Sequence, residues 1–224
     1  MEITKKITLL ILLLVAAVYK VSAQKKINEG IVTYNVSYEL NAVQLQYADQ
    51  LPKKITFYFR GDSTAATIKQ GSAIVKGVSV FKANFHSLLV ELPATSKKIV
   101  VVMTPAEVEE EKAENPHLKA VTGNEKQIID GYNCYKVTAT NAKNGESYEI
   151  WVTNDIDMPP NSISKPVSGF GGVPVLFVTF NRGIRINAEI EEIKETAIPP
   201  GFFSATKEYQ PMSFTDLQAL SGGN

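Results

Sequence analysis

Hydrophobic and polar residues alternate along most of the chain, which is the pattern of half-buried β-strands. In residues 30–40, the even positions from Val32 onward are apolar or aromatic, while the odd positions from Thr33 onward are polar. Residues 54–60 and 184–190 repeat this period of two. A polar side on each strand predicts an antiparallel sheet that turns its other side toward the core.

Further strands are expected between these segments. Residues 175–180 are apolar on both sides, which predicts a strand that is covered on both faces. The pair Asn144-Gly145 predicts a tight hairpin turn, because both residues tolerate positive φ. The remaining candidate strands are residues 63–69, 73–81, 87–92, 98–103, 127–139 and 147–153.

Helical signals are few and short. Thr104, Pro105 and Glu107 form an N-terminal capping pattern, which predicts a helix that ends before Pro116. Its sequence has almost no apolar side, so we expect it to lie on the surface. Residues 41–50 are expected to form a short helix or a loop, and residues 213–220 a short helix that seals one end of the sheet. Long loops are expected at residues 155–174 and 196–210.

About ten antiparallel strands with one or two short helices predict a mainly β fold. A sheet of that size twists until it curls, closes or splits into two layers. We therefore expect a strongly curved antiparallel sheet, with a closed β-barrel or a β-sandwich as the alternatives. The helices are too short and polar to fill the hollow of a curled sheet, so the sheet either packs against itself as a sandwich or encloses apolar space. The hypothesis of an enclosed space predicts a ligand cavity on the inner face. The residues predicted to line that cavity are Val32, Tyr34, Val36, Ile55, Phe57, Phe59, Ile186 and Ile190.

The N-terminus has the features of a secretory signal. Lys5 and Lys6 precede an apolar run at residues 7–19, and Ala23 is a small residue suited to cleavage after it. The run is about 13 residues long, whereas a bilayer-spanning helix needs about 20. We expect a signal peptide at residues 1–23, a single β-rich domain at residues 24–224, and no stable transmembrane segment after cleavage. The expected destination is the periplasm, with the extracellular space or the outer membrane surface as alternatives.

The charge balance bears on the class of partner. The chain has 23 basic and 23 acidic residues, and removal of the signal leaves 20 basic and 22 acidic residues. Nucleic acid is therefore not an expected partner, because phosphate binding requires a basic stripe.

No motif in the chain specifies a reaction. Cys134 is the single cysteine, which excludes an intramolecular disulfide, and we expect it to be a buried small residue rather than a redox thiol. His86 and His117 lack the spacing of zinc ligands, and no G-x-S-x-G nucleophile motif occurs. We expect a protein that is not an enzyme, with no catalytic residues, no metal ligands and no cofactor.

The order of several short segments is informative. These segments are residues 30–34, 55–62, 128–136, 149–156 and 203–212. Their order resembles the domain of unknown function 4412 family, which consists of exported proteins of Gram-negative bacteria. The hairpin around Gly131 and Cys134 is more loosely similar to families with a G-L-P-G-L-I loop. The resemblance implies an exported β-rich domain similar to the half-barrel of periplasmic lipoprotein carriers, and it implies no activity and no catalytic residues.

Two functions are compatible with these features. The leading hypothesis is a non-enzymatic envelope protein that carries or binds an apolar ligand, a lipid or an acyl chain, in the cavity of a curved sheet. The alternative is a protein–protein interaction or assembly module of the cell envelope that uses its sheet edges or long loops.

Overall fold

The fold is described from a computed structural model, which covers residues 26–113, 115–159, 170–181 and 183–222. The predicted signal peptide at residues 1–23 lies outside the described residues. The strands are β1 Glu29–Glu39, β2 Lys54–Arg60, β3 Ser63–Gln70, β4 Ala73–Val80, β5 Phe85–Leu92, β6 Lys97–Met103, β7 Leu118–Ile129, β8 Tyr132–Asn141, β9 Ser147–Thr153, β10 Val173–Asn181, β11 Ile184–Glu195 and β12 Gln210–Pro211. The helices are η1 Gln44–Gln50, η2 Pro93–Thr95, α2 Pro105–Ala113 and α3 Phe214–Gly222.

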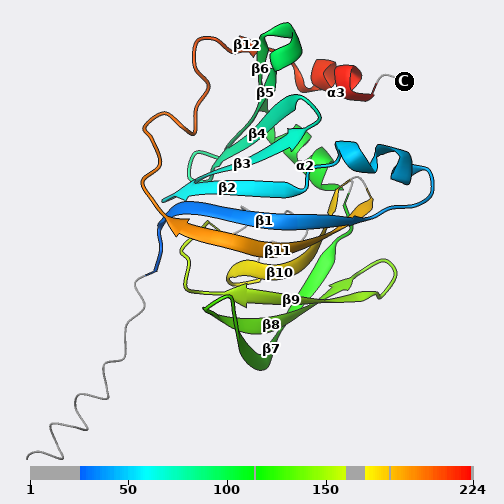
Figure 1. Ribbon diagram of the computed structural model, residues 1–224, viewed down its shortest axis with the longest axis vertical. Helices are drawn as coiled ribbons and strands as arrows, with labels where there is room; N and C mark the ends of the chain where they lie inside the picture. Colours follow the sequence, from blue (N-terminus) through cyan, green and yellow to red (C-terminus); the bar gives the residue numbers. More distant parts are fainter. Residues whose placement is uncertain (1–25, 114, 160–169, 182, 223–224) are drawn as a thin grey trace, which may run out of the picture.

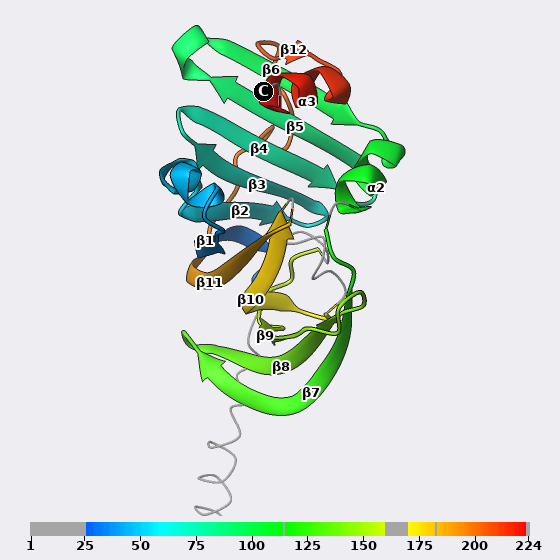
Figure 2. The same ribbon diagram turned by 90° about the vertical axis from the view of Figure 1, so that its right-hand side faces the viewer.

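All twelve strands belong to one sheet, in the order β12-β6-β5-β4-β3-β2-β1-β11-β10-β9-β8-β7. Neighbouring strands are antiparallel except for the short parallel contact of β12 with β6. The sheet is open, with β12 and β7 at its two ends, and it is strongly twisted and curved (Figures 1 and 2). The prediction of a mainly β, strongly curved antiparallel sheet with few short helices is confirmed.

The strand register defines two faces of the sheet. Val32 of β1 lies opposite Phe57 of β2, and the same row continues through β3 and β4 to Leu88 of β5. Directly opposed residues of antiparallel strands share a face. We call the face of this row the inner face. The outer face carries the alternate positions, including Ile31 and Tyr58.

The inner face carries two buried clusters. The larger cluster joins β1, β2 and β7–β11, and it contains Val32, Tyr34, Phe59 and most of the apolar residues of β8–β10. The smaller cluster lies on β5 and β6, where Val108 of α2 and Phe214 of α3 pack against it. The terminal helix therefore seals one end of the sheet, as predicted.

The outer face is covered by a strap, the segment of residues 196–209 that runs from β11 to β12 (Figure 1). Phe203 is buried there together with Leu89. The Arg60 guanidinium donates to the carbonyl of Ile198 at 2.9 Å and lies 5.5 Å from the Phe203 ring. Lys76 donates to the carbonyl of Phe202 at 3.0 Å. These contacts fasten the strap to the sheet, so the long loop predicted at residues 196–210 covers the core.

The hairpins differ from the sequence expectation at two points. The tight turn predicted at Asn144-Gly145 is wrong: β8 ends at Asn141 and β9 begins at Ser147, and only Gly145 of the pair has positive φ. The side chain of Asn141 accepts the N–H of Lys143, which stabilises the longer loop. The segment 127–139, expected as one strand, contains the turn between β7 and β8.

The segment that carries η1 is tied to β1 by Tyr38. The Tyr38 hydroxyl donates to the carbonyl of Pro52 at 2.7 Å. Burial raises the pKa of the Tyr38 phenol from 10.0 to about 12. Burial also raises the pKa of Tyr34 well above its ordinary value.

These shifts predict a loss of stability at alkaline pH. Because the folded chain holds the Tyr38 proton more tightly than the unfolded chain, this phenol contributes stability that is fully present below about pH 10 and is lost as the pH rises through about 12. We expect the melting temperature to fall over that interval. Melting curves with phenolate absorbance measure the effect, and Tyr38→Phe should show a shallower fall. Identical pH profiles for the two proteins would contradict this assignment.

Candidate functional site

The eight residues predicted to line a cavity all lie on the inner face. Six of them are buried in its core, with exposed fractions between 0% and 5%. These six buried residues are Val32, Tyr34, Phe57, Phe59, Ile186 and Ile190. The other two, Val36 and Ile55, are half-buried and pack against the larger cluster. The sequence therefore identified the inward-facing positions of β1, β2 and β11.

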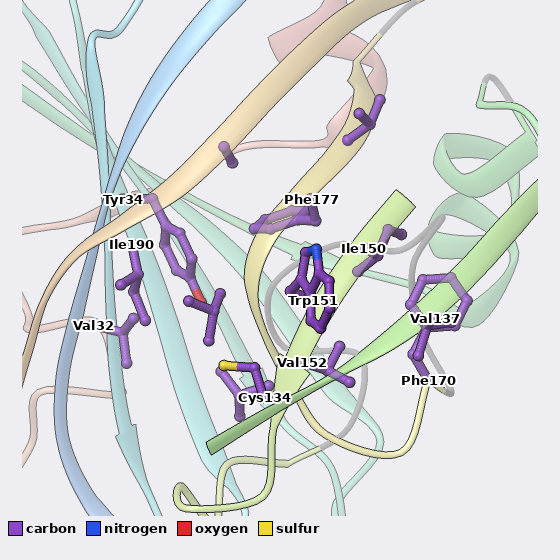
Figure 3. Packing of buried hydrophobic residues seen from close by; sticks show 14 of the residues in the cluster. Val32, Tyr34, Cys134, Val137, Ile150, Trp151, Val152, Phe170, Phe177 and Ile190 are labelled. Atoms are coloured by element: carbon purple, nitrogen blue, oxygen red, sulfur yellow. The ribbon is translucent and has the colours of Figure 1, made fainter. Parts of the chain in front are cut away.

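The larger cluster is densely packed around Tyr34. Its ring makes edge-to-face contacts with Phe57 at 5.7 Å and with Phe177 at 5.4 Å. Its hydroxyl donates to the carbonyl of Pro174 at 2.7 Å. Figure 3 shows Tyr34, Val32 and Ile190 on one side of this core and residues of β8 and β9 on the other. Val32 and Phe59 have no accessible surface, so no water-sized space lies beside them. A ligand could therefore reach these side chains only if the core opened. Their role in ligand binding stays a prediction.

An apolar strip crosses the inner face between the two clusters. Its members are half-buried, in contrast to the buried residues on either side. Two rows of opposed residues make it up, one through Ala66, Gly77 and Leu88 and one through Ile68 and Val75. We define the apolar strip as Ile55, Ala66, Ile68, Val75, Gly77 and Leu88.

Small residues form the floor of the apolar strip. Ala66 and Gly77 lie side by side on β3 and β4, between Phe57 and Leu88. A Cβ placed on Gly77 would have only one contact within 4 Å, with Cδ2 of Leu88 at 3.6 Å. The surface above Gly77 is therefore open. Figure 2 looks onto this face, where β3 and β4 are seen between α3 and β10, with η1 at one end and α2 at the other.

A polar row runs along the side of the strip nearer α2. Thr64 lies opposite Ser79, which lies opposite His86. The Ser79 hydroxyl and Nδ1 of His86 are 3.0 Å apart and hydrogen-bonded. The Phe81 ring contacts the His86 imidazole edge-on at 6.4 Å. The strip thus has an apolar floor and a polar row along one side, an arrangement that suits an amphiphilic ligand.

A separate cleft of about 370 Å³ lies where the β7–β8 hairpin meets the end of β9. Asp155 accepts the backbone N–H of Asn133 at 3.0 Å at its edge. The lining is Lys126, Gln127, Ile128, Asn133, Cys134, Tyr135, Asn154 and Asp155. Polar residues outnumber apolar ones in this lining, but apolar atoms provide most of its accessible surface, so the lining does not favour a polar ligand over an apolar one.

Cys134 contributes an unreactive thiol to this region. It is buried, and its Sγ donates to the carbonyl of Tyr132 at 3.4 Å. Burial raises the pKa of the Cys134 thiol, so the nucleophilic thiolate is disfavoured at neutral pH. Within the described part of the chain, no three His, Cys, Asp or Glu side chains form a group that could hold a metal ion.

Sequence reasoning missed both surfaces. The strip had a signal, because Ala66 and Gly77 occupy inward positions of two predicted strands where a filled core would place larger side chains. The cleft had a weaker signal. Asp155 begins one of the expected long loops, and its contact with Asn133 depends on the pairing of β8 with β9.

The comparisons with known proteins support a fold and a family match. A domain of unknown function, DUF4412, matches residues 42–158, just over half of the chain. Two structures of PNGF-II, in space groups C2 and P21, match with TM-scores of 0.53 and 0.52 at 16% and 15% identity. Both matches cover 86% of this chain but only 32% and 33% of PNGF-II, so the chain spans about a third of its length.

One lipoprotein structure is a weaker match. The Mycobacterium tuberculosis lipoprotein LppX matches at a TM-score of 0.37 and 11% identity, over 79% of this chain and 92% of LppX. No curated protein sequence matches the chain. None of the helices formed by the described residues has the length and apolar character needed to cross a membrane.

Proposed function

The chain belongs to the DUF4412 family, and from that premise we propose that it is an exported, non-enzymatic protein of the cell envelope that binds an acyl chain or lipid on its apolar strip. The observation that carries the proposal is the half-buried apolar surface between two buried clusters of one sheet face. An apolar surface that neighbouring side chains leave partly uncovered is a candidate contact for an apolar ligand.

The dimensions of the strip fit a chain-like ligand. The strip crosses four neighbouring strands, β2 to β5, and therefore extends over roughly 14 Å, because adjacent strands lie about 4.8 Å apart. An acyl chain laid over Ala66 and Gly77 would contact Phe57 on one side and Leu88 on the other. Covering this surface would make the free energy of binding more favourable by about 25 cal/mol for each Å² of apolar area removed from water.

The proposal differs in one respect from the site expected from the sequence. The strip retains Ile55 from the predicted set and replaces the other seven residues by neighbours on β3, β4 and β5. The packed core beside the strip keeps the strip rigid. The small residues of the strip leave space for a ligand. A lipid head group would lie toward Ser79 and His86, whose hydrogen-bonded side chains form a half-buried polar pair on that side of the strip.

Filling the apolar strip with a larger side chain should weaken the binding of a fatty acid. We expect Gly77→Leu to weaken the binding of cis-parinaric acid, a fluorescent fatty acid, by at least about tenfold, because the new side chain would occupy the open space above β4. Thr122→Leu is the matched control, since it adds the same side chain at an exposed position of β7. Fluorescence titration of the three proteins measures the effect.

Two outcomes would count against the proposal. Wild-type protein that does not bind the fatty acid, and that carries no lipid in native mass spectrometry after gentle purification, would remove it. Equal affinity of the wild type and Gly77→Leu would show that any binding occurs elsewhere. Circular dichroism and melting curves establish that the Gly77→Leu protein is folded.

One observation favours the alternative function as an interaction module. The edge strand β7 is exposed along almost its whole length, and Val121 and Ile128 are 68% and 73% exposed. A partner strand could pair with its free edge. Replacing Val121 and Ile128 by serine would then reduce capture of an envelope protein in a pull-down, whereas unchanged capture would exclude β7 as the contact.

A further inference from the structure

The short helix η1 has an unusual surface. It lies beside the strip, at the ends of the strands opposite α2 (Figure 2). None of its residues is buried. Val43, Leu45 and Tyr47 are 69%, 60% and 54% exposed, although all three are large and apolar or aromatic. Between Leu40 and Pro52 the only charged residue is Asp49. A cluster of exposed apolar side chains with so little charge is typical of a binding surface.

The exposure is held by the local structure of the segment. The side chain of Asn41 accepts the backbone N–H groups of Val43 and Gln44 at 3.0 and 2.9 Å, and the Gln44 side chain accepts the N–H of Asn41. At the other end, the N–H of Val36 donates to the carbonyl of Lys53. Both ends of the segment are thus fixed, and η1 lies on the inner-face side of the sheet (Figures 1 and 2).

Basic side chains accompany η1 at the same end of the strands. Lys53 precedes β2, Lys69 lies near the end of β3, and Lys97 begins β6. All three are exposed, and none forms an ion pair with a described residue. Two of the acidic groups nearby are engaged, because Glu208 pairs with Lys98 and Glu91 accepts the Tyr209 hydroxyl, which leaves Asp49 of η1 as a single exposed carboxylate beside the three lysines.

The opposite end of the same strands has a different charge. It carries α2, whose sequence contains four glutamates and one lysine, Lys112, and it carries Lys82 in the β4–β5 turn. Near an anionic surface, this asymmetry turns the η1 end toward the surface and α2 away from it. Exposed apolar side chains flanked by lysines are the combination that binds a bilayer interface.

We propose that η1 docks this protein onto an anionic lipid bilayer, with Val43, Leu45 and Tyr47 in the interface and Lys53, Lys69 and Lys97 against the head groups. The inference rests on the proposed function, since docking would place the near end of the apolar strip at the bilayer from which an acyl chain is taken. Tyr47 suits this position because its ring is apolar and its hydroxyl can remain in the head-group layer.

Vesicle co-sedimentation tests the docking directly. The exported protein is mixed with phosphatidylcholine vesicles that contain or lack phosphatidylglycerol. We expect the wild type to bind the anionic vesicles at least about tenfold more tightly than the variant with Val43, Leu45 and Tyr47 replaced by serine. The matched control replaces three other exposed apolar residues by serine and should bind as the wild type does. These are Val102, Val121 and Ile128.

A charge variant separates the two contributions. Lys53→Gln, Lys69→Gln and Lys97→Gln together should remove most of the difference between anionic and neutral vesicles, and added salt should have the same effect on the wild type. The proposal would be overturned if the wild type bound neither anionic nor neutral vesicles. It would also be overturned if the η1 variant bound anionic vesicles as well as the wild type does. Loss of a protein partner from the η1 variant, without vesicle binding by the wild type, would also overturn it.

Cargo binding is measured separately, so that the two proposals can fail independently. In the absence of vesicles, the η1 variant should bind cis-parinaric acid with the affinity of the wild type, because its substitutions lie outside the apolar strip. Fatty-acid binding without vesicle binding would leave the proposed function in place and remove the docking. Vesicle binding through η1 without fatty-acid binding would confirm the docking surface and remove the cargo.

Discussion

Replacement of Tyr34 by alanine will lower the free energy of unfolding by about 4 kcal/mol. Tyr34 is 1% exposed and fills the centre of the larger inner cluster, where it contacts the Phe57 and Phe177 rings. Its removal leaves a cavity between β1 and β10 and deprives the Pro174 carbonyl of its hydroxyl donor. Urea unfolding followed by tryptophan fluorescence measures the change, since Trp151 belongs to the same cluster.

Two further variants divide this effect into its parts. Tyr34→Phe keeps the ring and removes the hydroxyl, so it should cost about 1–2 kcal/mol for the unpaired buried carbonyl. Tyr47→Ala removes a tyrosine from exposed η1 and should change the stability by less than about 0.5 kcal/mol. A loss at Tyr34→Ala no greater than that at Tyr47→Ala would show that the core near β10 is not packed as described.

A methyl group on Gly30 will be poorly tolerated. Gly30 lies on β1 between β2 and β11, and a Cβ there would overlap the carbonyl oxygen of Lys194. Because the obstacle is backbone, the two central strands must separate, and we expect Gly30→Ala to cost about 3 kcal/mol. The melting temperature and the urea midpoint should both fall.

Gly77→Ala is the matched control for Gly30→Ala. Both glycines lie in strands, and neither has positive φ. The Cβ of Gly77→Ala meets only Leu88 at an ordinary contact distance, so the variant should stay within about 0.5 kcal/mol of the wild type. If Gly30→Ala were as stable as Gly77→Ala, the close approach of β1 to β11 would be contradicted.

Most of the strands that were predicted well have one buried face; β9, whose residues 150–153 are all buried, is the exception. β2 matches its predicted bounds, and β1, β3, β4 and β6 differ from theirs by one residue or less at each end. In these strands the inner and outer environments differ, so the hydrophobic pattern follows the pleat. The inward positions of β1 and β2 followed for the same reason, which is why Val32, Tyr34, Phe57 and Phe59 were identified correctly as inner-face residues.

β7 was missed over most of its length because it has no buried face. Only Leu118 is buried, and the residues from Lys119 to Ile128 are exposed on both sides, so no alternation marks them. A local signal was nevertheless available at Asp130-Gly131. Both residues have positive φ, 48° and 83°, and they form the two-residue turn between β7 and β8. This pair, and not Asn144-Gly145, provides the tight hairpin.

The candidate site could be predicted only in part. The hydrophobic pattern indicates which face of the sheet a side chain lies on, but it does not indicate how far that side chain is buried. Alternation placed Phe57 and Ile55 on the same face, but it could not tell which of them other strands would cover. That difference depends on β10 and β11 folding over one half of the sheet, and on the small size of Ala66 and Gly77 in the other half. The cation–aromatic contacts of the strap were likewise beyond the sequence, because Arg60 and Phe203 are far apart in the chain.

The position of β1 has a consequence for assembly. β1 is among the first strands to be made, but it lies at the middle of the sheet and pairs on one side with β11, near the opposite end of the chain. The run from β1 to β6 can form by neighbour-to-neighbour pairing, and so can the run from β7 to β11. Their union depends on the slow, non-local β1–β11 ladder. Until β11 arrives, the nascent polypeptide presents an unpaired strand with one apolar side, so we expect a chaperone that shields β1 to raise the yield of folded protein.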